Sequence, residues 1–121
     1  MTEYPKKVLV ITKNLMFIPR IESEAGSLAK VKKISSIQNL KDELKDSKII
    51  AALIYLEESD SIWEPILKEL QTTLEYPTLT IAYGPHKNIA LMDKAKELGC
   101  DHVLAKGAFL TKLRSILKSI V

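Results

Sequence analysis

An uninterrupted apolar segment in the middle of the chain, residues 49–56, constrains the fold more than any other feature. It reads IIAALIYL and directly follows Lys48. A membrane-spanning helix needs about 20 apolar residues, so this run is too short to cross a bilayer. Strands covered on both faces have this near-continuous apolar composition, whereas a strand with one wet face alternates. The run predicts a central parallel strand over residues 48–56.

Strand-like and helix-like segments alternate along the rest of the chain. Four further strands are expected over residues 7–12, 31–34, 78–83 and 101–105. Apolar residues recur at helical spacing after each strand, as Ile18, Ile21, Ala25 and Leu28; Ile37, Leu40 and Leu44; Trp63, Ile66, Leu67, Leu70 and Leu74; Ile89, Met92, Ala95 and Leu98; and Phe109, Leu113, Ile116, Leu117 and Ile120. Helix ends are indicated by Ser35-Ser36 and Ser61 with Glu64 as N-terminal caps, and by Gly99 just past a C-terminus.

Consecutive strands joined by helices must be parallel and connected by right-handed crossovers. The compact solution for five such units is a doubly wound five-stranded parallel sheet between two helix layers, a three-layer α/β sandwich. Five strands favour the flavodoxin-like order 2-1-3-4-5. A length of 121 residues fits one domain, spanning residues 1–121.

Composition limits the expected cellular location and the expected classes of partner. The formal net charge is only +3, and 16 lysines stand against 2 arginines. Sequence-specific DNA readers depend on arginine for bidentate base contacts, so a nucleic-acid partner is not favoured. The single cysteine, Cys100, excludes an internal disulfide, and the polar segment 1–7 does not resemble a signal peptide. We therefore expect a cytoplasmic protein without membrane attachment.

Ligands of doubly wound sheets bind outside the carboxyl ends of the strands. The candidate ligand-binding residues at these ends are Thr12, Asn14, Tyr55, Glu57, His86 and Lys106. Segment 12–22 has no glycine for a dinucleotide fingerprint, and the chain has no phosphate-binding Gly-Lys-Ser/Thr loop. The two histidines and one cysteine have neither zinc spacing nor the arrangement of a nucleophile and its base. We expect no cofactor, no metal and no catalytic residue, which makes enzyme activity the less favoured interpretation.

The last third of the chain resembles the end of a response-regulator receiver domain. The segment AKELGCDHVLAKGAFLTKL, residues 95–113, has a helix ending in a Gly-Cys-Asp turn, a hydrophobic strand ending in Lys106, and Phe109 shortly afterwards. In receivers a proline follows the lysine, but Gly107 stands there, which puts the usual cis peptide in doubt. Segments LMF, 15–17, and GPH, 84–86, also resemble a group of uncharacterised receiver-like proteins that lack the phosphorylation pocket.

The resemblance implies a magnesium site that these residues do not form. A working receiver has an acidic pair after the first strand and a phosphate-accepting aspartate at the end of the third, which supply the oxygen ligands of Mg²⁺. Here the acidic pair falls on Thr12 and Lys13, and the acceptor falls on Tyr55. Phosphorylation is therefore not expected unless Glu57 or Glu58 substitutes for the missing aspartate.

Our main hypothesis is a non-catalytic, phosphorylation-independent pseudo-receiver that acts by protein–protein contact. By resemblance to receivers, its contact surface would be the stretch from Asn88 to Val121, and its partner would be another protein or a second copy of the chain. Two alternatives stay open. The lysines at 30, 32 and 33 could form a nucleic-acid surface, or His86 and Lys106 could bind a small anion or support an undescribed reaction. Lys106 is expected to pair with Glu57 or Glu58 as a structural remnant.

For several other residues the sequence predicts only whether the side chain is buried or exposed. Trp63 is expected to anchor its helix in the core, while an exposed Trp63 would indicate an interface. Residues 15–17 either fold onto the end of the sheet or form an exposed apolar patch. Cys100 and His102 are expected to be packing and surface residues.

Overall fold

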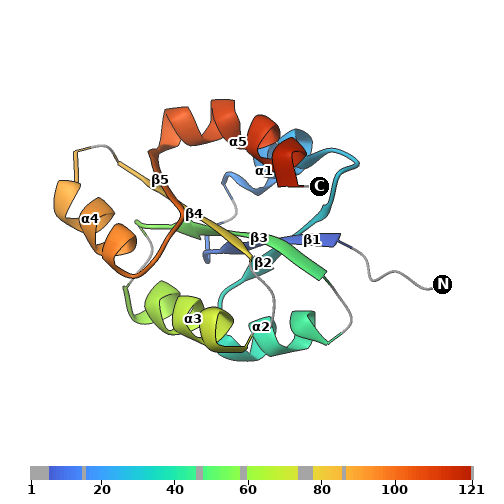
Figure 1. The fold of residues 1–121 in the computed structure, drawn as a ribbon, viewed down its shortest axis with the longest axis horizontal. Coiled ribbons are helices and arrows are strands. Elements are labelled where there is room, and N and C mark those ends of the chain that lie inside the picture. The colour runs from blue at the N-terminus through green and yellow to red at the C-terminus, as the bar shows by residue number, and fades with distance from the viewer. Residues whose placement is uncertain are drawn as a thin grey trace.

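A five-stranded parallel sheet forms the centre of the computed structural model (Figure 1). The structure describes residues 6–14, 16–45, 48–57, 60–73, 78–85 and 87–120, without the side chains of 60, 61 and 120. The strands are β1 (Lys6–Ile11), β2 (Lys30–Ile34), β3 (Lys48–Tyr55), β4 (Leu79–Gly84) and β5 (His102–Ala105). Their order is β2-β1-β3-β4-β5, and every neighbouring pair is parallel, which confirms the predicted topology.

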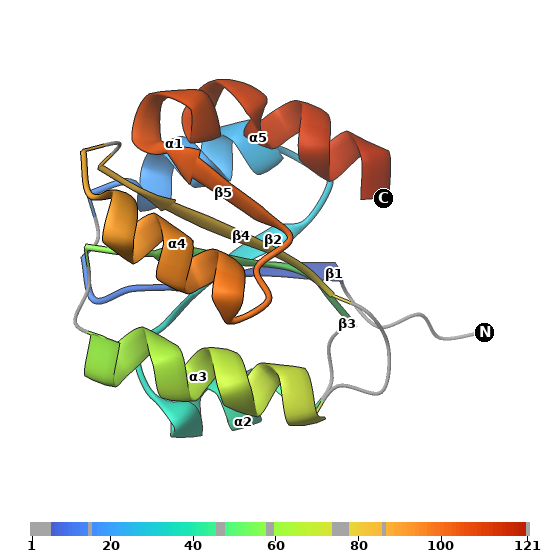
Figure 2. The same ribbon diagram turned by 60° about the vertical axis from the view of Figure 1, so that its left-hand side comes forward.

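Helices cover both faces of the sheet, as the alternation of segments predicted. They are α1 (Ile18–Ala25), α2 (Ile37–Leu44), α3 (Asp60–Thr73), α4 (Ile89–Glu97) and α5 (Lys106–Ile120). Figure 2 shows α1 and α5 side by side on one face, with α2 and α3 on the other and α4 beside the β5 edge. None of the described helices is long and apolar enough to span a membrane.

The central strand supplies both hydrophobic cores because it is buried on both faces. Ile49, Ala52 and Ile54 pack towards α2, α3 and α4, whereas Leu53 and Tyr55 pack towards α1 and α5. The pairing of β1 with β3 shifts by one residue early in β3, where the partner of Lys7 is Ile49 and that of Val8 is Ala51. The inserted residue moves Ile50 to the α1–α5 side, so strict alternation begins only after it.

Local signals define two helix ends that the sequence predicted. The Ser36 Oγ accepts a hydrogen bond from the backbone N–H of Asn39 at 3.1 Å, which caps α2 as expected. Gly99 has a φ of +96° just past α4, and this left-handed conformation suits glycine and ends the helix.

Two helix boundaries differ from the sequence prediction. α1 ends at Ala25, where Gly26 turns the chain at a φ of +55°, so Leu28 packs against the core from beyond the helix. α3 begins at Asp60, so Ser61 lies inside the helix and not at its cap. Leu74, expected in the α3 stripe, lies outside the described residues.

Trp63 is completely buried, which confirms the core prediction and leaves no indole surface for an interface. Lys94 of α4 lies 5.9 Å from the centre of its ring, and the Lys94 Nζ is 2.6 Å from the Glu64 carboxylate. The Gln71 amide donates a 2.9 Å hydrogen bond to the carbonyl of Leu98 at the other end of the same helix pair. These contacts tie α4 to α3.

Candidate functional site

The carboxyl ends of the strands meet at one edge of the sheet because all five strands are parallel. Thr12 follows β1, Tyr55 ends β3, Gly84 ends β4, and Lys106 follows β5. Tyr55 is directly opposite Tyr83 in the register of β3 and β4. The close approach of β4 to the segment after β3 requires Gly84, since a Cβ there would lie 3.1 Å from the Cβ of Leu56. The fold thus places Thr12, Tyr55 and Lys106, which belong to the predicted set, at this edge.

Thr12 and Asn14 shape the loop that follows β1. The backbone N–H of Thr12 continues the ladder by donating to the Ile34 carbonyl at 3.0 Å. The Thr12 Oγ1 accepts a hydrogen bond from the Asn14 N–H at 2.9 Å, and the Asn14 Oδ1 accepts one from the Met16 N–H at 2.8 Å. Thr12 is buried, whereas Lys13 is exposed. These side-chain oxygens therefore stabilise the turn itself.

Tyr55, Glu57 and Lys106 form a hydrogen-bonded cluster. The Tyr55 hydroxyl donates to the Glu57 Oε2 at 2.6 Å, and the Lys106 Nζ lies 2.8 Å from the Glu57 Oε1. Both oxygens of the Glu57 carboxylate are therefore engaged. This ion pair is one of the two that the sequence allowed, and Glu58, the other candidate, lies outside the described residues.

The cluster shifts the pKa of each of its members. The hydrogen bond from Lys106, followed by that from Tyr55, lowers the pKa of Glu57. The same hydrogen bond to Glu57 raises the pKa of Lys106. Burial, and then the hydrogen bond to Glu57, raises the pKa of Tyr55. Charged Glu57, charged Lys106 and neutral Tyr55 are thus stabilised together around neutral pH.

Aromatic rings cover the cluster and connect it to the core. The Lys106 Nζ lies 5.4 Å from the ring centres of both Phe17 and Tyr55, within the range of cation–π attraction. The Phe17 and Tyr55 rings meet edge to face at 6.3 Å. Tyr55 stacks on Tyr83 at 5.4 Å, and Tyr83 stacks on Phe109 of α5 at 4.0 Å. A continuous row of rings therefore runs from the loop after β1 to α5.

The sequence did not decide whether Phe17 packs against the sheet or is exposed. Phe17 packs against the core while Met16, next to it, is 72% exposed. These two residues of segment 15–17 therefore follow different alternatives of the two that the sequence left open. Leu15 and His86 lie outside the described residues, and the proposed role of His86 stays a prediction. His102 is exposed, while Cys100 packs against the core and burial raises the pKa of its thiol to about 11.

The described residues at this edge do not form a set of Mg²⁺ ligands. The described residues contain no group of three acidic, histidine or cysteine side chains that could hold a metal ion. Glu57 is the carboxylate of the cluster, and both its oxygens already accept hydrogen bonds. Lys13 and Tyr55 add a cation and a phenol where Mg²⁺ would require further anionic oxygens.

Comparisons with known proteins identify the fold. No family model and no curated protein sequence matches the chain. A receiver domain from Bacteroides fragilis superposes with a TM-score of 0.77 at 14% identity, over 96% of this chain and 96% of that one. The receiver domain of the TMAO respiratory regulator TorR gives 0.73 at 14% identity, over 97% and 100%. The phosphorylated cyanobacterial phytochrome response regulator RcpA gives 0.69 at 18% identity, over 98% and 91%. The chain has the fold of the response-regulator receiver domains.

Proposed function

We propose that this protein is a phosphorylation-independent pseudo-receiver, a non-catalytic regulatory module that acts by contact with another protein. The observation that carries the proposal is the Tyr55–Glu57–Lys106 cluster at the carboxyl edge of a receiver-like sheet. Phosphoryl transfer in such a fold needs carboxylates that bind Mg²⁺ and one that accepts the phosphoryl group. Tyr55 is mostly buried and donates a hydrogen bond to Glu57, and Glu57 forms an ion pair with Lys106. These contacts occupy the groups that stand where a receiver would bind Mg²⁺ and the phosphoryl group.

The same pairing argues against small-anion binding at Lys106. An anion would have to compete with a carboxylate whose oxygen lies 2.8 Å from the ammonium group. The Phe17 and Tyr55 rings also occupy space around that group. Protein contact is therefore favoured over ligand chemistry.

The proposed contact surface is the stretch from Asn88 to Val121, formed by α4, β5 and α5. Ile89 is 67% exposed on α4, and Leu110 and Ile116 of α5 are only partly buried. The same two helices carry exposed charged residues of both signs, namely Asp93, Lys96, Glu97, Lys112, Arg114 and Lys118. A mixed rim around apolar side chains suits self-association by a two-fold axis, so the partner is a second copy or another cytoplasmic protein. The side chain of Ile120 and all of Val121 lie outside the described residues.

Phosphorylation is tested with acetyl phosphate and with beryllofluoride, each with Mg²⁺. We expect no mass increase and no change in the amide NMR spectrum at concentrations that saturate a working receiver. A Glu57→Gln variant is the matched control for a substitute acceptor. A phosphorylated species that disappears in this variant, or any stable phospho-adduct in the wild type, would contradict the proposal.

The contact surface is tested by sedimentation at several concentrations. We expect an Ile89→Asp substitution to weaken self-association by about tenfold or more, because it places a charge on an apolar contact. Met16→Asp is the matched control, since Met16 is equally apolar and 72% exposed but lies outside this surface. A monomeric wild type at high concentration would exclude the homodimer. Equal weakening by both substitutions would exclude this surface.

A further inference from the structure

The strand β2 forms an edge of the sheet and carries three exposed lysines. It pairs with β1 alone, because it is the first strand in the order β2-β1-β3-β4-β5. Three of its five residues, Lys30, Lys32 and Lys33, are exposed lysines. Within the part of the chain that the structure describes, none of these lysines makes an ion pair. Three exposed ammonium groups on one short strand favour an acidic partner.

The backbone of β2 offers hydrogen-bonding groups outward. The carbonyl of Ile34 accepts from Thr12 and therefore faces β1. Successive residues of a strand direct their N–H and C=O groups to opposite sides. Counting back from Ile34, the groups of Lys32 and Lys30 face β1, while those of Val31 and Lys33 face away from the sheet.

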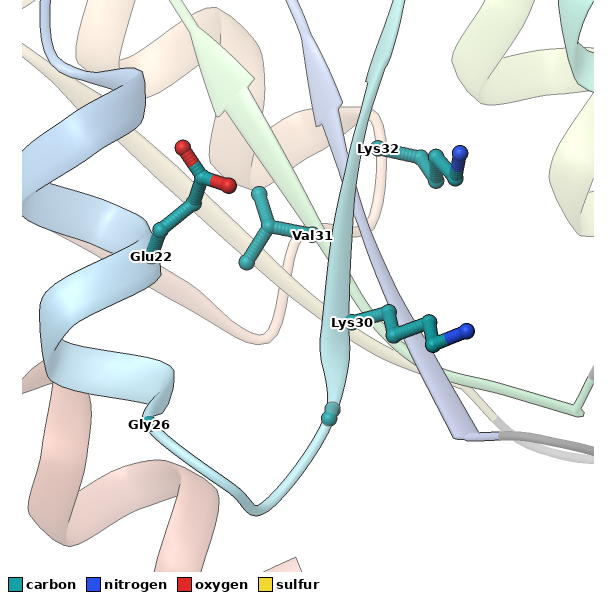
Figure 3. A pocket seen from close by; sticks show the side chains of 6 residues that line it. Glu22, Gly26, Lys30, Val31 and Lys32 are labelled. Carbon is teal, nitrogen blue, oxygen red and sulfur yellow. The ribbon is translucent and has the colours of Figure 1, made fainter.

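The two sides of this edge differ in chemistry. A hollow of about 410 Å³ lies between α1 and β2, lined by Glu22, Gly26, Ala29, Lys30, Val31 and Lys32. Figure 3 shows the Glu22 and Val31 side chains on the side of the hollow, with the Lys30 and Lys32 side chains projecting to the opposite side of the strand. An added strand would therefore meet two ammonium groups on one face and, on the other, a hollow where Val31 and Glu22 lie.

We propose that the β2 edge binds an extended acidic segment of a partner protein as a sixth strand. Acidic side chains at alternate positions of that segment pair with Lys30 and Lys32, and the small or apolar side chains between them lie over the hollow at Val31. The same lysines oppose pairing of two β2 edges, since like charges would meet, and they leave an acidic strand as the favoured partner. This edge lies opposite β5, so the inference does not depend on the proposed contact surface.

A nucleic acid is the other polyanion to consider, and the edge suits it less well. The Glu22 carboxylate lines the hollow and would repel phosphates. Lys33 follows the alternation of the strand and lies on the opposite face to Lys30 and Lys32, so the three lysines do not present one continuous surface. An extended peptide is complementary to both faces and to the outward backbone groups.

The first test separates strand addition from simple charge attraction. The probe is a fluorescent ten-residue peptide of alternating glutamate and valine, and its control is the same peptide N-methylated at alternate residues. We expect the unmodified peptide to bind and the N-methylated peptide to bind at least about tenfold more weakly, because it cannot form a ladder. Equal binding of the two peptides, or binding of neither, would overturn the proposal.

The second test uses variants of the edge itself. Lys33→Pro removes a charge and an outward N–H, whereas Lys33→Ala removes only the charge. We expect the proline variant to bind about three- to tenfold more weakly than the alanine variant. Amide hydrogen exchange in the wild type gives an independent measurement, since the peptide should protect the N–H groups of Val31 and Lys33. Unchanged exchange at both amides in the presence of bound peptide would refute strand addition.

The third test addresses charge and the competing polyanion. The double variant Lys30→Glu with Lys32→Glu should weaken peptide binding by about tenfold or more. The control is Lys112→Glu with Lys118→Glu, which changes the net charge equally on α5 and should leave binding nearly unchanged. Equal effects of the two double variants would overturn the proposal. So would a labelled oligonucleotide that binds more tightly than the peptide and depends on the same two lysines.

Discussion

The Glu57–Lys106 pair should stabilise the folded protein by a measurable coupling energy. At 2.8 Å, two unit charges attract by about 1.5 kcal/mol at the dielectric constant of water and by about 6 kcal/mol at an effective value of 20, before any desolvation cost. The side chains are 33% and 36% exposed, so solvent screens much of this attraction. The shared hydrogen bonds and the covering rings should make the coupling energy of this pair larger than that of a fully exposed ion pair. We expect a coupling of about 1 kcal/mol.

A double-mutant cycle of Glu57→Gln, Lys106→Met and the double variant measures this coupling by urea unfolding. Since the pKa of Glu57 is lowered in the folded state, its contribution is present above its ordinary pKa of 4.5 and is lost as the pH falls through the folded value. The coupling should therefore be near 1 kcal/mol at pH 7 in low salt and should disappear under strongly acidic conditions. A coupling below about 0.2 kcal/mol at pH 7, or one unchanged in acid, would refute the role assigned to the pair.

Three further stability predictions follow from the structure, each measured by urea unfolding. Leu53→Ala should destabilise by about 2–5 kcal/mol, because Leu53 is completely buried, and an effect below about 1 kcal/mol would show that its packing is misassigned. Gly84→Ala should cost about 1–3 kcal/mol, since its Cβ would lie 3.1 Å from that of Leu56, and a neutral effect would mean that β4 adjusts freely. Tyr55→Phe should cost about 0.5–1.5 kcal/mol through the lost hydrogen bond to Glu57 and should raise the pKa of Glu57, measurable by NMR titration.

The topology could be predicted from the sequence because its signals were redundant. The apolar run over 49–56 required burial on both faces, and the alternation of segments required parallel strands. A short sheet of this kind has few compact arrangements, and the predicted order was correct. The Ser36 cap and Gly99 were also placed correctly, since each uses a local hydrogen bond or a backbone conformation that the residue type favours.

The bulge in β3 and the end of α1 could not be predicted from the sequence because both depend on tertiary context. The bulge near Ile50 leaves no trace in an all-apolar segment, because either face accepts an isoleucine. Leu28 continues the helical period of α1 even though Gly26 ends the helix, since residues beyond a turn can reach the same core. Periodicity reports which residues are buried more reliably than it reports where a helix stops.

The candidate site also has features that the sequence predicted and features that depend on tertiary context. The strand ends were predictable, and so was an ion pair for Lys106 with one of two glutamates. The row of rings from Phe17 to Phe109 was not predictable, because it combines four segments that are distant in the sequence. One signal of this row was present in the sequence. Tyr55 and Tyr83 stand near the ends of two adjacent parallel strands, and this position brings their rings together.

Charge balance explains how the Tyr55–Glu57–Lys106 cluster is stable at this edge of the sheet. Several carboxylates at one sheet edge repel one another and are stabilised when a cation joins them. Here Glu57 and Lys106 neutralise each other, the Tyr55 hydroxyl uses the remaining oxygen of Glu57, and the Phe17 ring covers the ammonium group. A cation that binds the Glu57 carboxylate would have to displace Lys106 from it, which would break the contacts that hold the cluster together. This arrangement supports the proposed function, in which the module responds to a protein contact and not to a metal-dependent phosphoryl group.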